Sequence, residues 1–97
     1  MEEYIVYEVT YKNKPVYIGS GKRERVEHAK SGKSHCVELN KLFFEDNSNI
    51  NVLILRENLT KQESLELEKE YIQATEPKFN KVHTNRYRKI KRQLINL

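Results

Sequence analysis

The segment YIVYEVTYKNKPVYIG (residues 4–19) decides the fold that this sequence predicts. Its first eight residues are β-branched or aromatic apart from one glutamate, a composition that favours a strand. Alternate residues of that strand share one face: Ile5, Tyr7, Val9 and Tyr11. The polar triplet 12–14 predicts a turn, and Pro15 can open a second strand because the first residue of a strand tolerates a missing N–H. The segment therefore predicts a β-hairpin.

Two helices are expected after the hairpin. Gly19 and Gly21 break the second strand, and a helix is predicted over about residues 22–30, ending at Gly32. Ser34 is expected to cap the next helix, which ends at the polar run DNSN. Its apolar residues recur at helical spacing: Cys36, Leu39 and Phe43.

A third strand and a third helix complete the pattern. INVLILR (residues 50–56) is almost wholly apolar, which predicts a strand covered on both faces and therefore central in the sheet. TKQE (residues 60–63) is a capping box, and the helix that it starts is expected to run to about Ala74. The predicted fold is a small three-stranded α/β (α+β) sandwich in the order β-β-α-α-β-α, followed by a basic C-terminal helix.

Length and composition predict one small intracellular domain. The chain has 97 residues, and no apolar run approaches the roughly 18 residues that a membrane span needs. The start MEEY resembles no signal peptide, and the lone Cys36 cannot form an intramolecular disulfide. We therefore expect a cytoplasmic protein without a membrane partner, divided into a domain over residues 1–82 and a basic helix or tail over residues 83–97.

The net charge of +4 is unevenly distributed along the chain. Residues 1–80 contain twelve Lys/Arg and fourteen Asp/Glu, whereas residues 81–97 contain six Lys/Arg and no acidic residue. The C-terminal segment has the charge that binds nucleic-acid phosphates, and it is equally compatible with a solvated tail. Its candidate phosphate contacts are Arg86, Arg88, Lys89, Lys91 and Arg92.

Glu68 lies on the unexpected face of the third predicted helix. Four glutamates follow TKQE at 63, 66, 68 and 70, and at about 100° per residue three of them fall together on one side. Glu68 falls instead among the apolar residues, which are Leu65, Leu67, Tyr71 and Ile72. A carboxylate on that side needs a cationic partner. The partner is either Arg25 or Arg56 in a salt bridge, or a metal ion or substrate proton in a functional site.

The order of short motifs along residues 4–80 resembles the GIY-YIG nucleases. Val6-Tyr7 and Tyr17-Ile18-Gly19 match the two tripeptides that name the family, although Ile5 replaces the first glycine. The other matching positions follow in order: Arg25 and His28, then His35, then Glu68 ahead of Tyr71-Ile72, then Pro77-Lys78-Phe79-Asn80. The resemblance implies a mainly antiparallel sheet and independently selects the same glutamate as the helical angles.

The resemblance implies metal-dependent hydrolysis of DNA phosphodiester bonds. Glu68 would hold one Mg²⁺ or Mn²⁺, and Arg25 would donate to a phosphate oxygen. Tyr7, with Tyr17 or His28, would orient or deprotonate the attacking water; a tyrosine base needs a nearby cation to lower its pKa. Three residues would support the site, namely Gly19, His35 and Asn80, and Lys22 and Arg23 would contact nucleic acid. Arg23 and Arg25 both lie near the expected spacing, and Val26 and the i+3 position of His28 favour Arg25.

Double-stranded DNA is the expected partner, and small size is compatible with a phage or mobile-element enzyme. No room is left for a separate DNA-binding domain, so targeting would rely on weak sequence preference, a homodimer or a partner protein. Two other functions stay open: a non-catalytic nucleic-acid-binding or regulatory protein on the same fold, and a nuclease that cuts RNA.

Overall fold

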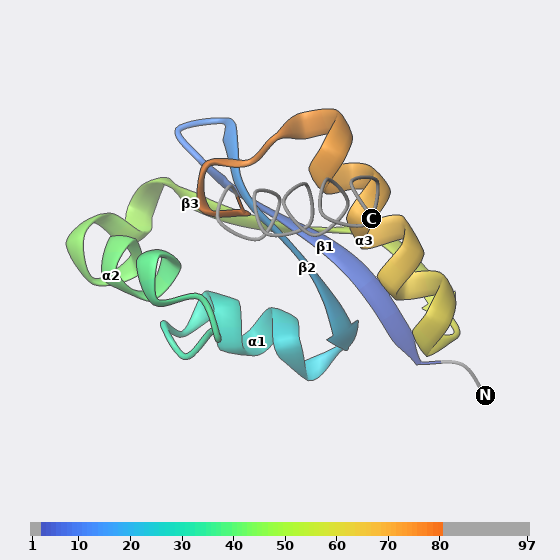
Figure 1. Cartoon of the computed structure of the whole chain (residues 1–97). Coiled ribbons are helices and arrows are strands. Elements are labelled where there is room, and N and C mark those ends of the chain that lie inside the picture. The colour runs from blue at the N-terminus through green and yellow to red at the C-terminus, as the bar shows by residue number, and fades with distance from the viewer. Residues whose placement is uncertain (1–2, 81–97) are drawn as a thin grey trace, which may run out of the picture.

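The predicted hairpin is present. The computed structural model describes residues 3–80, in which β1 spans Tyr4–Tyr11 and β2 spans Lys14–Lys22 (Figure 1). Between them Lys12 and Asn13 have φ of 52° and 67°, the positive values that a two-residue type I′ hairpin turn requires at both central positions. The strands pair antiparallel, with Tyr7 opposite Gly19.

The third strand is at an edge of the sheet, so the sequence-based prediction of a central strand is wrong. β3 spans Ile50–Leu59, and the antiparallel sheet has the order β2-β1-β3. The central strand is β1, whose Val6 and Val9 are fully buried, whereas Leu53 of β3 is 59% exposed. An apolar run shows that a strand buries some surface, but the number of its neighbours depends on chain topology, which the run does not encode.

Helices cover both faces of the sheet. α1 (Glu24–Lys30) and α2 (Val37–Asp46) lie on one side, and α3 (Lys61–Thr75) lies on the other (Figure 1). Each side has its own core. The first contains Ile5, Tyr7, Val9, Val16, Val26, Ala29, Cys36 and Leu39, and the second contains Val6, Ile18, Leu59 and Ile72. The predicted order of strands and helices is confirmed, with two short 3₁₀ turns added, η1 (Asn47–Asn49) and η2 (Lys78–Asn80).

The starts of the first two helices differ from the prediction by a few residues. α1 begins at Glu24 because Lys22 still belongs to β2. The N-cap of α2 is Cys36 rather than Ser34. The Ser34 hydroxyl instead accepts a hydrogen bond of 3.1 Å from the Cys36 backbone N–H, so it shapes the turn before the helix.

The capping box of α3 is confirmed. The Thr60 hydroxyl accepts a 3.0 Å hydrogen bond from the Glu63 N–H, and the Glu63 carboxylate accepts a 2.9 Å bond from the Thr60 N–H. Ser64 and Ile72 are the buried residues of this helix, whereas Leu65, which the helical angles placed on the apolar face, is 53% exposed. Leu65 lies at the margin of that face, where it lines a cavity together with Tyr4 and Ser20 of the sheet.

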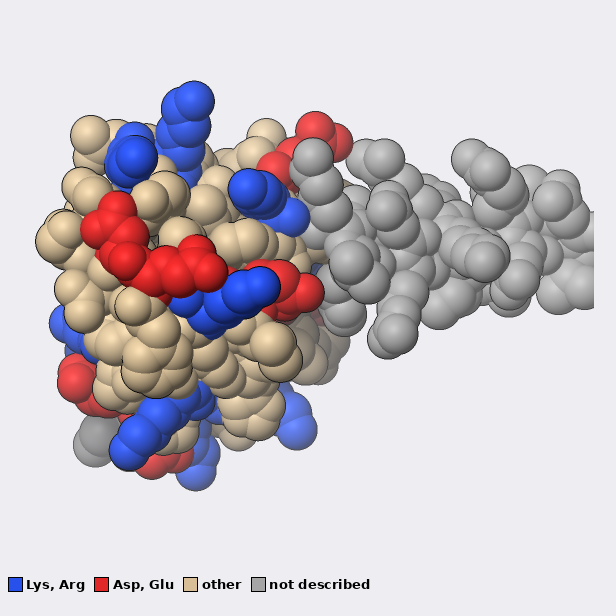
Figure 2. Space-filling model, turned by 90° about the vertical axis from the view of Figure 1, so that its left-hand side faces the viewer, with Lys and Arg blue, Asp and Glu red and all other residues tan. Residues whose placement is uncertain are grey.

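Charges of both signs are interspersed over the side of the molecule that carries α2, where described residues are visible (Figure 2). The basic segment over residues 83–97, its five candidate phosphate contacts and the expected domain boundary after residue 82 lie outside the described residues. No helix in the part of the chain that the structure describes is long and apolar enough to cross a membrane.

Candidate functional site

Two tyrosines meet across a glycine on the β1–β2 hairpin. The rings of Tyr7 and Tyr17 are 6.1 Å apart and tilted by 49°. A Cβ added to Gly19 would lie 2.5 Å from Cζ of Tyr7 and 2.9 Å from Cε2 of Tyr17. Because real Cβ atoms do not approach that closely, Gly19 is the residue that lets the Tyr7 phenol lie over β2. Tyr7 is only 4% exposed, and Tyr17 is half-buried.

Arg25 lies against the end of the same strand. A Cβ on Gly21 would be 2.8 Å from Cγ of Arg25. The φ of 148° at Gly21 is a backbone angle that residues with a side chain rarely adopt. The positive charge of Arg25 acts to lower the pKa of both Tyr7 and Tyr17. Arg23 is placed differently, since its guanidinium donates to Glu57 of β3 at 2.7 Å on the surface. Of the two arginines, Arg25 is therefore the one beside the tyrosines.

Glu68 reaches the same strand from the opposite face. The Ser20 hydroxyl of β2 donates a hydrogen bond to the Glu68 carboxylate. The negative charge of Glu68 acts to raise the pKa of both Tyr7 and Tyr17. Ser20 was not identified from the sequence, although strand alternation places it on the face opposite Tyr17 and Gly19, toward α3.

Burial raises the pKa of both phenols above the ordinary tyrosine value. Burial raises the pKa of Tyr7 well above its ordinary value; the neighbouring Tyr17 adds to this effect, and Arg25 only partly opposes it. Burial also raises the pKa of Tyr17 to about 12, with further contributions from Cys36 and Glu68. The sequence-based expectation that a nearby cation lowers the tyrosine pKa is not met by Arg25 alone, because desolvation of the phenolate is the larger effect. The Tyr7 hydroxyl donates a hydrogen bond to the Tyr17 hydroxyl, which raises the pKa of Tyr7 and lowers that of Tyr17.

The Asn80 side chain hydrogen-bonds to the free backbone edge of β2. Its side-chain Oδ1 accepts a 2.8 Å hydrogen bond from the Ile18 N–H, and its Nδ2 donates a 3.1 Å bond to the Ile18 carbonyl. These two bonds replace those that one residue of a further neighbouring strand would make. Asn80 is itself buried, with an exposure of 5%. It fixes the strand position between Tyr17 and Gly19.

The two candidate histidines, His28 and His35, occupy different environments. His28 of α1 is half-buried, and its Nδ1 atom is buried with no hydrogen-bond partner among residues 3–80. His35 is exposed in the segment between α1 and α2. Lys22 is exposed at the end of β2. The roles expected of these three residues stay predictions.

The fold that carries these residues has a counterpart of known structure. The chain is similar to the GIY-YIG N-terminal endonuclease domain of UvrC from Thermotoga maritima, a point mutant bound to its catalytic divalent cation. The TM-score is 0.54 at 25% sequence identity, and the match covers 80% of this chain and 82% of that one. The chain has a GIY-YIG-like fold. No protein-family model and no curated protein sequence matches it.

The donor set of the candidate site fits a magnesium ion that would be held mainly by water and substrate. Within residues 3–80, no group of three or more His, Cys, Asp or Glu side chains is placed to hold a metal ion. Mg²⁺ commonly takes one or two carboxylates and completes its octahedron with waters and phosphate oxygens. Glu68 is a half-buried carboxylate close to both tyrosines, which suits that mode of binding.

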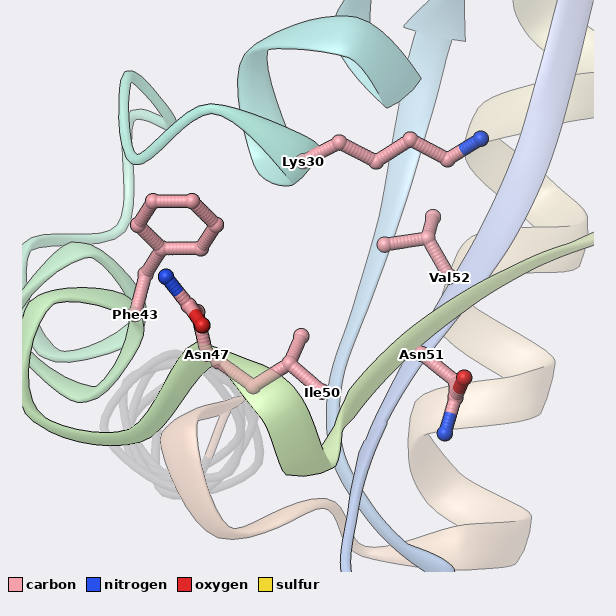
Figure 3. A pocket seen from close by; sticks show the side chains of 6 residues that line it. All are labelled: Lys30, Phe43, Asn47, Ile50, Asn51 and Val52. Carbon is pink, nitrogen blue, oxygen red and sulfur yellow. The ribbon is translucent and has the colours of Figure 1, made fainter.

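A separate cavity lies at the other edge of the GIY-YIG-like sheet. It has a volume of about 390 Å³ and is lined by Lys30, Phe43, Asn47, Ile50, Asn51 and Val52. Figure 3 shows Phe43 from α2 and Val52 from β3 turned toward the same space, with Lys30 extending across it from α1 and Asn51 turned away. None of the candidate site residues lines this cavity.

Proposed function

We propose that the chain is a divalent-metal-dependent endonuclease that hydrolyses phosphodiester bonds of DNA. The observation that carries this proposal is the meeting of two phenols, a guanidinium and a carboxylate at one edge strand: Tyr7, Tyr17, Arg25 and Glu68. The GIY-YIG-like fold supports a hydrolytic nuclease as the general class. Metal dependence and DNA as substrate are parts of the proposal.

Arg25 binds a non-bridging oxygen of the scissile phosphate. Its aliphatic stem is held against Gly21, which limits the freedom of the guanidinium before substrate arrives. A guanidinium presents parallel N–H groups that fit two phosphate oxygens, whereas a lysine ammonium is a point charge. Arg25→Lys should therefore retain binding better than it retains cleavage.

Glu68 would hold one Mg²⁺ or Mn²⁺, which supplies charge neutralisation at the phosphate and at the leaving oxygen. The Ser20 hydroxyl donates to this carboxylate and so orients it toward β2. Tyr7 is too buried to move freely, and its hydroxyl donates a hydrogen bond to Tyr17. Tyr17 and His28 are less buried than Tyr7, so either can contact the attacking water.

The test is nicking of supercoiled plasmid by the full chain, with and without EDTA. Glu68→Ala and Arg25→Ala should each lower the rate on the order of 100- to 1000-fold, the usual effect of removing one charge-stabilising group. Glu70→Ala is the matched control, because Glu70 is an exposed glutamate of the same helix. Circular dichroism checks that each variant is folded.

Three outcomes separate the alternatives. Nicking that survives EDTA and both substitutions contradicts the mechanism. Binding of DNA without any metal-dependent cleavage favours a non-catalytic nucleic-acid-binding protein. Cleavage of RNA but not of DNA under the same conditions assigns the site to a ribonuclease.

A further inference from the structure

A cavity of about 330 Å³ adjoins the candidate site at the end of β2. Ser20 and Arg25 line it, so it shares two residues with the site described above. Its outer wall comes from the opposite helix, where Lys61 and Leu65 of α3 contribute. The volume is within the range of about 300–1,000 Å³ that is usual for small-molecule sites. It is suited to one nucleotide rather than to a whole duplex.

The charge of the cavity favours an anion. Three cationic side chains line it, Lys22, Arg25 and Lys61, against one carboxylate, Glu24. This local excess of positive charge contrasts with residues 1–80 as a whole, where acidic residues outnumber basic ones. A phosphate placed here would be attracted by cations from two elements that lie far apart in the sequence.

Lys61 is poorly placed for helix stability. It is the first residue of α3, where the helix dipole favours acidic side chains and disfavours cations. The capping box of Thr60 and Glu63 already satisfies the start of this helix without it. A residue that departs from the usual preference of its position, and gains no stability by doing so, is a candidate for a functional role.

Apolar surface in the cavity is also open to solvent. Leu65 is 53% exposed although it borders the apolar face of α3, and the half-buried Tyr4 of β1 lines the same cavity. An aromatic ring beside phosphate-binding cations is the arrangement on which nucleobases stack. The cavity therefore combines a cationic rim with a surface for a base.

We propose that this cavity binds the nucleotide next to the scissile phosphodiester, with its phosphate on Lys22 and Lys61 and its base over Tyr4 and Leu65. The proposal rests on the proposed nuclease function, because it treats the substrate strand as passing from Arg25 into the cavity. It adds Lys61 to the residues that contact nucleic acid and defines a second phosphate subsite.

The first experiment measures the affinity of the full chain for a labelled DNA duplex over a range of salt concentrations, in EDTA so that no cleavage intervenes. Lys61→Glu should weaken binding and reduce the slope of log affinity against log salt by about 0.9, the value for one lost phosphate contact on duplex DNA. Lys41→Glu replaces an exposed lysine of α2 and is the matched control. Its slope should differ from the wild-type slope by less than half as much as the slope of Lys61→Glu does. An unchanged slope in Lys61→Glu, or an equal loss in the control, overturns the proposal.

The expected loss of DNA affinity in Lys61→Glu would not result from destabilisation of the fold. Glu at the first position of α3 suits the helix dipole, so the urea midpoint of Lys61→Glu should equal or exceed that of the wild type. Nicking by the wild type is scored separately. A chain that does not nick but shows the Lys61 effect loses the proposed function and keeps the subsite, whereas a chain that nicks with an unchanged Lys61 slope loses only the subsite.

A second experiment tests the base. Thymidine 3′,5′-bisphosphate and its abasic analogue, deoxyribose 3,5-bisphosphate, are titrated into the labelled full chain, and the backbone amide signals of Gly21 and Ser64 are followed by NMR. Both residues line the cavity. The thymidine compound should shift these signals at lower concentration than the abasic analogue does, and Lys61→Glu should weaken both effects. Equal binding of the two probes overturns the role of Tyr4 and Leu65, and absent shifts overturn the subsite.

Discussion

The two edges of the sheet are built in opposite ways. At the β2 edge, Asn80 pairs with both backbone groups of Ile18, and glycines admit the side chains of Tyr7 and Arg25. At the β3 edge, Leu53 is 59% exposed. The ion pair that reaches this strand, between Arg23 and Glu57, lies on the surface. The less apolar strand therefore has the more closely fitted surroundings.

The difference shows what a site demands of a sheet edge. A free edge strand is stable enough when its apolar residues are covered on one side, and β3 meets only that condition. Groups that act on a phosphate must be held in fixed positions by their neighbours. The β2 edge meets this second condition because the Asn80 side chain fixes the strand and Gly19 and Gly21 leave room for other residues.

The largest expected difference between the edges comes from removing an asparagine at each. Asn80→Ala leaves the N–H and the carbonyl of Ile18 without these hydrogen bonds in a buried environment, and each unsatisfied group costs about 1–3 kcal/mol. We expect the free energy of unfolding to fall by about 2–6 kcal/mol. Asn51→Ala, at an exposed position of β3, should change it by no more than about 0.5 kcal/mol.

Urea denaturation measures both values, and hydrogen exchange locates the effect. The Ile18 amide should lose protection in Asn80→Ala more than the amides of β3 do. Equal destabilisation by the two substitutions would show that the β2 edge does not depend on the Asn80 side chain.

Much of the fold could be predicted from the sequence, because its signals are local. The hairpin, the capping box at Thr60 and the order of elements depend on short-range chemistry, and all are confirmed. The position of β3 could not be predicted, since an apolar run does not reveal how many strands flank it. The exposure of Leu65 likewise depends on where the sheet ends under α3.

The candidate site, like the fold, could be predicted from the sequence only in part. Helical angles placed Glu68 toward the sheet, and its hydrogen bond with Ser20 agrees with that placement. Ser20 itself was missed because a serine between glycines has no distinctive pattern in a sequence. The environment of the tyrosines was also misjudged, since desolvation depends on the packed helices around them.

An intermediate effect is expected from the buried phenol at the β2 edge. Burial raises the pKa of Tyr17 to about 12, whereas a tyrosine in the unfolded chain ionises near 10. The unfolded state therefore loses its proton first, and the free energy of unfolding contributed by Tyr17 is present below pH 10 and is lost as the pH rises toward 12. Over this pH interval, the free energy of unfolding of Tyr17→Phe should fall by about 1–2 kcal/mol less than that of the wild type.

Urea denaturation of the wild type and of Tyr17→Phe at several pH values between 9 and about 12 measures the difference. The two proteins should differ in the slope of stability against pH in this interval more than they differ in its value at pH 7. Parallel curves would mean that the phenolate of Tyr17 is as well solvated in the folded protein as in the unfolded chain.

The smallest effect is expected from the ion pair at the β3 edge. The Arg23 guanidinium and the Glu57 carboxylate are 2.7 Å apart, but their side chains are 62% and 52% exposed. Solvent screening reduces such a pair to about 0.2–1 kcal/mol of coupling. A double-mutant cycle with Arg23→Ala and Glu57→Ala, measured by urea denaturation, should give a coupling energy in that range that falls further in high salt.

Nicking assays of the two single variants of this cycle, together with Arg25→Ala, test whether the two arginines differ in role as they differ in place. Arg23 is engaged at the β3 edge, whereas Arg25 lies beside the phenols at the β2 edge, so Arg25→Ala should slow nicking far more than Arg23→Ala does. Glu57→Ala frees Arg23 from its carboxylate partner and should leave nicking closer to the wild-type rate than either arginine substitution does. A larger loss of nicking in Arg23→Ala than in Arg25→Ala would move the phosphate contact to the first arginine. The close fit of Arg25 over Gly21 would then be a packing feature of the strand end.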